Sequence, residues 1–143
     1  MNTGYITEYT TDYLLLLPKL KEVASQPRPP QGTKEFYRWY VCNQMIDFPE
    51  SDMCGLVESG NVVAVCYYAD WIDYHQMGYL VSFRRGAGKK LFEEYIRRNS
   101  YPRVYTEPIN KEVEQVYRSW GFRDVNQCDP NFGEYWDEYL VYN

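Results

Sequence analysis

The chain has 143 residues and a mass of 17.1 kDa, which leaves room for one domain with one hydrophobic core. Its formal net charge of −5 disfavours nucleic-acid binding, because an acidic chain repels phosphate backbones. Aromatic residues make up 18% of the chain, including 16 tyrosines, which is unusually many. Composition alone allows these rings to form a heavy core or to line a site that stacks on a flat ligand.

The sequence predicts a cytoplasmic protein that does not enter a membrane. Its longest aliphatic run, Leu14 to Leu17, is far below the roughly 20 residues that span a bilayer, and the N-terminus lacks the pattern of a signal peptide. The four cysteines are scattered, and the chain has one histidine to join them. We therefore expect buried, reduced thiols and no metal site.

The first half of the chain predicts a strand, two helices and three further strands. Residues 4–10 suit a strand, and Thr11 or Asp12 is a candidate N-cap for a helix that kinks or restarts at Pro18. The proline-rich residues 26–32 predict a loop, after which Thr33 caps a second helix. The next strands are expected at residues 53–59, 61–71 and 76–83, with a tight turn between the first two.

The second half predicts two helices and the remaining strands. A helical stripe occupies residues 89–99, a strand follows at 103–108, and a strongly amphipathic helix runs from Asn110 to Trp120. Gly121 ends that helix, and residues 122–125 and 134–143 suit closing strands. We expect one α/β domain over residues 1–143, with a mixed central sheet flanked by helices on both faces.

A basic, glycine-rich loop is the clearest chemical feature of this acidic chain. Residues 84–90 read RRGAGKK and connect a predicted strand to a helix. Glycines allow close backbone approach to a ligand, and the N–H groups at a helix start attract anions. The pattern predicts a phosphate cradle, with an ordinary glycine turn and solvated basic side chains as the alternative.

Two motifs, taken together, resemble the GCN5-related N-acetyltransferase (GNAT) superfamily. The family's pyrophosphate loop follows R/Q-x-x-G-x-G/A, and FRRGAG occupies its place here, with Phe83 at the usual Arg or Gln position. The family's later pattern is N-x-x-A-x-x-F-Y-x-x-x-G-F. The chain matches its spacing with Asn110, Val113, Val116, Tyr117, Gly121 and Phe122. The resemblance implies a short-loop GNAT fold whose sheet is splayed between strands 4 and 5.

The resemblance also implies an N-acyltransferase that uses acetyl-CoA or another acyl-CoA as cosubstrate. The loop would bind the pyrophosphate, the preceding strand would pair with the pantetheine arm, and Asn110 would lie beside that arm. The implied cofactor-binding residues are Leu80, Val81, Ser82, Arg84, Arg85, Gly86, Ala87, Gly88, Lys89, Asn110 and Tyr117. Tyr117 would be the general acid that protonates the leaving thiolate. Periodicity alone favours a core position for Tyr117, and an N-cap explains Asn110 equally well.

A general base must accept a proton from the attacking amine. Glu107 is our candidate, with Asp70, Asp73 and His75 as other possibilities, and a solvated surface position is the alternative for each. The implied acceptor is an amine, either a small molecule or a protein lysine or N-terminus. We expect it near residues 22–50 and the acidic side chains Asp47, Glu50 and Asp52.

Two other functions compete with the enzyme. Phe83 and the unassigned base are compatible with a catalytically degenerate GNAT-fold protein that has a structural, regulatory or interaction role. Nucleic-acid binding through exposed tyrosines is a weaker alternative, because the charge disfavours it. The sequence leaves the oligomeric state open between monomer and homodimer.

Overall fold

The computed structural model describes residues 7–48, 52–70, 75–99, 103–125 and 139–142. Its strands are β1 (Thr7–Thr10), β2 (Met53–Glu58), β3 (Asn61–Asp70), β4 (His75–Ser82), β5 (Val104–Thr106), β6 (Arg123–Asp124) and β7 (Leu140–Tyr142). Its helices are α1 (Tyr13–Ala24), α2 (Lys34–Met45), α3 (Ala87–Asn99) and α4 (Lys111–Ser119). Residues 1–68 and 79–99 form one compact unit, and residues 69–78 and 100–143 form a second.

Antiparallel pairing joins β1, β2 and β3 in the first unit. The β2–β3 hairpin turns through Ser59 and Gly60, whose φ angles are 51° and 82°. Positive φ at both central residues matches the right-handed twist of the paired strands. The register of the two strands shifts between Leu56 and Val57, close to this turn. The predicted tight turn and its two strands are confirmed.

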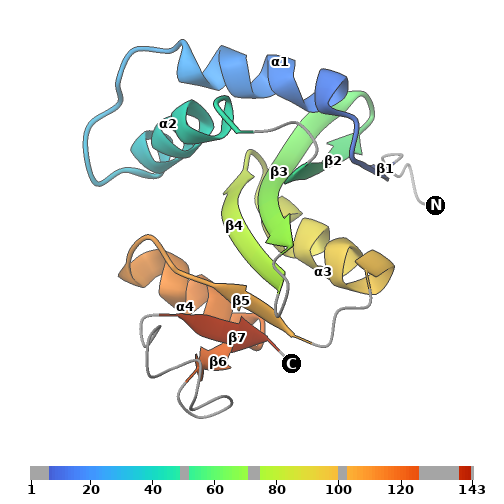
Figure 1. The fold of residues 1–143 in the computed structure, drawn as a ribbon. Helices are drawn as coiled ribbons and strands as arrows, with labels where there is room; N and C mark the ends of the chain where they lie inside the picture. Colours follow the sequence, from blue (N-terminus) through green and yellow to red (C-terminus); the bar gives the residue numbers. More distant parts are fainter. Residues whose placement is uncertain (1–6, 49–51, 71–74, 100–102, 126–138, 143) are drawn as a thin grey trace, which may run out of the picture. The chain divides into compact units, whose positions relative to one another are not determined.

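Helices cover both faces of the strands in this unit (Figure 1). α1 and α2 bury their apolar stripes against one face, where Leu16, Leu20 and Val41 join Met53, Val65 and Val81 in one cluster. Cys54, Cys66 and Tyr68 alternate to the other face, where the Tyr68 ring lies 5.5 Å from the α3 residue Tyr95. The prediction of helices on both faces is confirmed.

A glycine lets α1 approach β2 closely. A Cβ atom at Gly55 would collide with Cδ2 of Leu16, and it would also lie 3.0 Å from the carbonyl oxygen of Ala64. Leu16 is fully buried, so its side chain fills the space above Gly55. The contact fixes α1 on the sheet by complementary shape.

Both helices on this face begin at the predicted caps. Asp12 accepts a hydrogen bond from the N–H of Leu14 at 3.0 Å, and Thr33 accepts one from the N–H of Phe36 at 3.1 Å. The sequence predicts a kink or a restart at Pro18; α1 continues through it as one helix, so the restart is wrong. Pro18 is exposed in the middle of α1. Water can therefore reach the carbonyl group that lacks a hydrogen bond because proline has no N–H.

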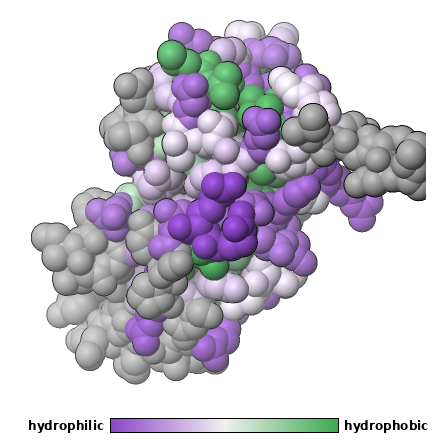
Figure 2. Space-filling view, turned by 90° about the vertical axis from the view of Figure 1, so that its right-hand side faces the viewer, coloured by the Kyte–Doolittle hydropathy of each residue, from purple (hydrophilic) through white to green (hydrophobic). Residues whose placement is uncertain are grey.

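The start of α1 also exposes apolar surface. Leu14 is 76% exposed and Leu15 is 52% exposed. Figure 2 shows hydrophobic residues, in green, on the surface in the upper part of the view. Among the described residues, no helix is long and apolar enough to cross a bilayer.

The second unit contains the first half of β4 with β5, β7 and β6. β5 is parallel to β4, whereas β7 is antiparallel to both β5 and β6. β4 and β5 pair at two positions, His75 with Val104 and Gln76 with Tyr105. Next in line, the hydroxyl of Thr106 donates to the carbonyl of Met77 at 2.9 Å.

The hydrogen-bonded strand order is β1-β2-β3-β4-β5-β7-β6. The parallel β4–β5 pair makes this a mixed sheet, as the sequence predicts. The predicted strands at 103–108, 122–125 and 134–143 correspond to the shorter β5, β6 and β7. Parts of the first and last predicted strands, residues 4–6, 134–138 and 143, lie outside the described residues.

Candidate functional site

The glycine-rich loop of the first unit connects β4 to α3 through residues 83–86. Ser82 closes its base: the Ser82 hydroxyl donates to the carbonyl of Arg84 at 2.6 Å and accepts from the N–H of Gly88 at 3.2 Å. Gly86 has a φ of 82°, a backbone conformation that glycine adopts without strain. The N–H of Ala87 donates back to Arg84 at 3.0 Å. The loop is therefore a tight, internally bonded turn at the start of a 13-residue helix.

Two of the four predicted pyrophosphate donors are used inside this turn, namely the N–H groups of Ala87 and Gly88. Within the described parts of the chain, the N–H groups of Gly86 and Lys89 donate to no protein acceptor. They belong to the turn and first helical residues, where the helix dipole favours negative charge. The loop can thus offer two backbone donors to an anion.

The basic side chains around the loop differ in their partners. The guanidinium of Arg84 pairs with the buried carboxylate of Glu58 at 2.6 Å, and it also donates to the carbonyl of Arg85 at 2.9 Å. Lys90 donates to the hydroxyl of Thr7 at 3.3 Å. Arg85 and Lys89 are exposed. The charge of Arg84 is therefore compensated within the protein, whereas Arg85 and Lys89 face solvent.

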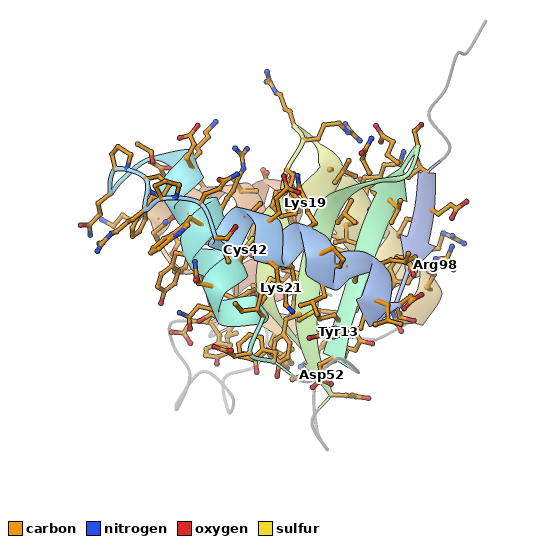
Figure 3. The ribbon with its side chains drawn as sticks, turned by 90° about the horizontal axis from the view of Figure 1, so that it is seen from above. Tyr13, Lys19, Lys21, Cys42, Asp52 and Arg98 are labelled. Atoms are coloured by element: carbon orange, nitrogen blue, oxygen red, sulfur yellow. The ribbon has the colours of Figure 1, made fainter. Side chains whose placement is uncertain are left out.

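Phe83 occupies the motif position where the family has Arg or Gln, and its role here is packing. Its N–H donates to the carbonyl of Val63 in β3 at 2.8 Å, and its ring packs against the core beneath α1 and α2. The ammonium group of Lys19, labelled in Figure 3, lies 5.2 Å from the centre of that ring. The Arg or Gln side chain that is usual at this motif position is thus replaced by an aromatic one.

Two adjacent residues of α2 reach the end of β4. The hydroxyl of Tyr37 donates to the carbonyl of Leu80 at 2.9 Å, and Nε of Arg38 donates to the carbonyl of Ser82 at 2.8 Å. Peptide groups alternate between the two edges of a strand, and the N–H of Phe83 points to β3. The carbonyls of Leu80 and Ser82 therefore lie on the opposite edge. Burial raises the pKa of Tyr37, so its hydroxyl stays protonated and remains a donor.

This edge contact involves residues that the sequence did not single out. The helical stripe containing Tyr37 predicts that its side chain faces the sheet. Nothing local marks Arg38 or Glu58, because their partners lie 44 and 26 residues further along the chain.

In the second unit, α4 holds both predicted motif residues. The side-chain oxygen of Asn110 accepts a hydrogen bond from the N–H of Val113 at 2.8 Å, so Asn110 is an N-cap. Tyr117 is 4% exposed, and its ring lies 5.4 Å from Trp120 and 5.5 Å from Phe122. The packing alternative therefore describes the surroundings of Tyr117, and its role as an acid remains a proposal.

The candidate bases lie in different environments. Glu107 and Asp70 are exposed, and Asp73 lies outside the described residues. His75 is 2% exposed, so a surface position is wrong for it. Its Nδ1 atom lies 3.5 Å from a carboxylate oxygen of Asp70. Burial lowers the pKa of His75 below the ordinary 6.5, and the neighbouring Asp70 opposes this shift.

This burial predicts an acid-sensitive fold. Because the folded chain resists protonation of His75, the unfolded state binds more protons below about pH 6.5. The free energy of unfolding should therefore fall as the pH is lowered from 7 to 5, by at most about 1.4 kcal/mol per pH unit for one proton. Urea denaturation at several pH values measures it. A His75→Gln variant should show a shallower decline, and equal slopes would contradict the prediction.

Acidic and aromatic side chains gather after α2 in the first unit. Phe48 lies 4.1 Å from the ring of Tyr67 and 5.6 Å from that of Tyr79. Burial raises the pKa of Tyr67, and the charge of Asp52 adds to the shift. Asp47 is exposed beside this cluster in sequence, and Glu50 lies outside the described residues. These rings account for part of the tyrosine excess by packing against each other.

The thiols of Cys42, Cys54 and Cys66 are free and buried, as predicted, and Cys128 lies outside the described residues. Burial raises the pKa of Cys42 to about 12, so this thiol stays protonated at neutral pH. Within the described ranges, no cluster of three or more His, Cys, Asp or Glu side chains is arranged to hold a metal ion.

Comparison with known proteins finds similarity in structure rather than in sequence. No family model matches the chain, and no curated protein matches it. N-acetylglutamate synthase from Neisseria gonorrhoeae, solved with coenzyme A and L-arginine, matches 96% of the chain with a TM-score of 0.59 at 14% identity. The match covers 33% of the synthase chain, so the present chain spans about a third of that protein.

Two shorter acetyltransferases match over nearly their whole length. Ard1 from Thermoplasma volcanium has a TM-score of 0.55 at 14% identity, with 97% of this chain and 95% of Ard1 covered. A GNAT-family acetyltransferase from Bacillus cereus has a TM-score of 0.51 at 15% identity, with 96% and 95% covered. Together with the mixed sheet and the parallel β4–β5 pair, these matches show that the chain has the fold of the GNAT acetyltransferases.

Proposed function

We propose that the protein is an acyl-CoA-dependent N-acyltransferase, with acetyl-CoA the first cosubstrate to test. The observation that best supports this function is the β4–α3 turn, where the N–H groups of Gly86 and Lys89 are available to an anion. The fold and the motif spacing agree with it, and the similar synthase was solved with coenzyme A. Acyl-CoA would supply the acyl group as a thioester.

The residues around the turn suit the phosphate end of such a cosubstrate. Gly86 and Lys89 would donate backbone hydrogen bonds, while the side chains of Arg85 and Lys89 add exposed positive charge. Leu80, Val81 and Ser82 are the residues that would lie along the pantetheine arm as an added half-strand. On this edge the N–H groups of Leu80 and Ser82 would donate to the arm, because their carbonyls already accept from Tyr37 and Arg38 and the peptide groups of Val81 face β3. Arg84 has a different part, because its pairing with Glu58 ties the turn to the end of β2.

On the α4 side we assign Tyr117 as the general acid and Asn110 as a residue beside the pantetheine arm. A phenol has an ordinary pKa near 10, which suits protonation of a thiolate leaving group. Glu107 is our proposed base, because its side chain is exposed directly after β5. The proposed acceptor is an amine, which the acidic Asp47 and Asp52 would attract.

Turnover of acetyl-CoA tests the proposal. We expect release of free thiol in the presence of at least one member of a panel of polyamines, amino acids and lysine-containing peptides. Coenzyme A should also raise the melting temperature, because a ligand at a hundredfold excess over Kd stabilises the folded state by about 2.7 kcal/mol. Binding without turnover by any amine would favour the catalytically degenerate alternative. Neither binding nor turnover would overturn the proposed function and would agree with a degenerate scaffold whose pocket no longer binds coenzyme A.

A further inference from the structure

The edge of β4 beside the glycine-rich turn is held by a positively charged side chain that no carboxylate of the described residues pairs with. Arg38 of α2 donates through Nε to the carbonyl of Ser82, which fixes the guanidinium at the base of the turn. Among the described residues, no acceptor bonds to its two terminal nitrogens. Figure 1 shows α2 beside β4.

Ser82 links this guanidinium to the turn. The Ser82 carbonyl accepts from Arg38, while the Ser82 hydroxyl accepts from the N–H of Gly88 and donates to the carbonyl of Arg84. Ser82 therefore bonds to the Arg38 guanidinium through its carbonyl and to the start of α3 through its hydroxyl. A half-buried guanidinium without a carboxylate is unusual, because partial burial of charge costs free energy unless a partner offsets it.

Arg84 and Arg38 differ in whether a carboxylate pairs with their charge. Arg84, in the turn itself, is already neutralised by the buried carboxylate of Glu58. Phe83 holds an aromatic ring where a polar side chain was expected. Arg38 is thus the cation that the fold fixes beside the turn by a hydrogen bond while leaving its planar fork open. Such a fork suits the paired oxygens of a phosphate.

We propose that Arg38 positions the pyrophosphate of the cosubstrate, supplying from α2 the charge that position 83 lacks. This inference rests on the proposed function for the identity of the ligand. Nε keeps its bond to Ser82, and the two terminal nitrogens donate to phosphate oxygens. Arg38 acts on binding and placement, and it takes no part in proton transfer.

Arg38→Gln tests this assignment by its effect on a series of ligands measured by calorimetry and NMR titration. Coenzyme A and dephospho-coenzyme A both contain the pyrophosphate, whereas pantetheine contains no phosphate. We expect the variant to weaken binding of the first two by roughly 10- to 100-fold and to leave pantetheine within about twofold. Arg38→Lys should recover part of the loss, because it keeps the charge without the fork.

Tyr37→Phe is the matched control, since it removes the neighbouring hydrogen bond between α2 and β4 without removing charge. This variant should change the affinities for all three ligands by one common factor. An equal loss for pantetheine in Arg38→Gln would show a role in packing only and overturn the proposal. A loss confined to coenzyme A would assign Arg38 to the 3′-phosphate and would overturn it as well.

Inorganic pyrophosphate separates this inference from the proposed function. If coenzyme A does not bind to the wild type, the proposed function fails while the anion site is still tested. Pyrophosphate that binds to the wild type and at least tenfold more weakly to Arg38→Gln would support Arg38 as an anion ligand. Equal binding to both proteins, or binding to neither, would overturn that role. Circular dichroism of each variant checks that it is folded.

Discussion

Replacing Tyr117 with phenylalanine is expected to lower kcat by roughly 100-fold or more while leaving the Kd for coenzyme A within about twofold. The change removes one hydroxyl and keeps the ring that packs against Trp120 and Phe122. If this hydroxyl protonates the leaving thiolate, its loss acts on the chemical step. Steady-state kinetics with saturating acetyl-CoA, together with calorimetry, separates the two effects.

Tyr105→Phe is the control for this experiment. Tyr105 is 3% exposed in β5 and packs with Val125 and Val141, so the substitution also removes a buried hydroxyl from the second unit. It should leave kcat within about twofold. An unchanged kcat in Tyr117→Phe would identify Tyr117 as a core tyrosine. Equal losses in the two variants would point to a general disturbance of this unit.

The contact between α1 and β2 predicts the largest effects on stability. Leu16→Ala should lower the free energy of unfolding by about 2–5 kcal/mol, because a fully buried side chain is cut back and leaves a cavity. Gly55→Ala should cost about 1–3 kcal/mol, because its new methyl group collides with Leu16. Urea denaturation measures both values.

The double variant tests whether these two costs share one cause. With alanine at position 16, the methyl group at position 55 enters space that the leucine had filled. The combined loss should therefore be at least about 1 kcal/mol smaller than the sum of the single losses. Additive losses would show that the carbonyl of Ala64, 3.0 Å from the added carbon, is the main obstacle at Gly55.

The parts of the fold that sequence predicts well are those determined by neighbouring residues. Asp12, Thr33 and Asn110 cap helices because each offers an oxygen to an N–H two or three residues ahead. The turn at Ser59 and Gly60 lies between two apolar runs, which is a local pattern as well. The restart predicted at Pro18 fails because burial of Leu16 and Leu20 holds α1 together across the proline.

The candidate site was predictable in its backbone and less so in its side chains. The glycines and the helix start are visible in the sequence, so the turn of residues 83–86 follows from local rules. Two of its four predicted donors, however, bond within the turn itself. Which cation is neutralised depends on residues that are distant in the sequence. Glu58 forms an ion pair with Arg84, and Arg38 reaches Ser82 from α2. The burial of His75 likewise depends on how the sheet packs around it. A single histidine in a sequence does not indicate whether it will be buried.

The aromatic excess has a structural explanation over much of the chain. Phe48, Tyr67 and Tyr79 form one cluster, and Phe36 contacts Trp39 and Tyr40 along α2. The guanidinium of Arg28, from the proline-rich loop, lies 5.4 Å from the ring of Phe36. These rings join segments of the protein to each other, so a stacking ligand is not needed to explain them.

The cap at the start of α4 also determines what Asn110 can offer to a bound molecule. Its side-chain oxygen already accepts a hydrogen bond from Val113, so the amide nitrogen, with its two hydrogens, is the group left to point outward. Asn110 is exposed, so its amide N–H groups can donate to a carbonyl oxygen of a bound molecule. Aspartate or serine would cap the helix equally well and would lack this amide donor. In the proposed site, asparagine would therefore combine the helix cap with a hydrogen-bond donor to the bound molecule.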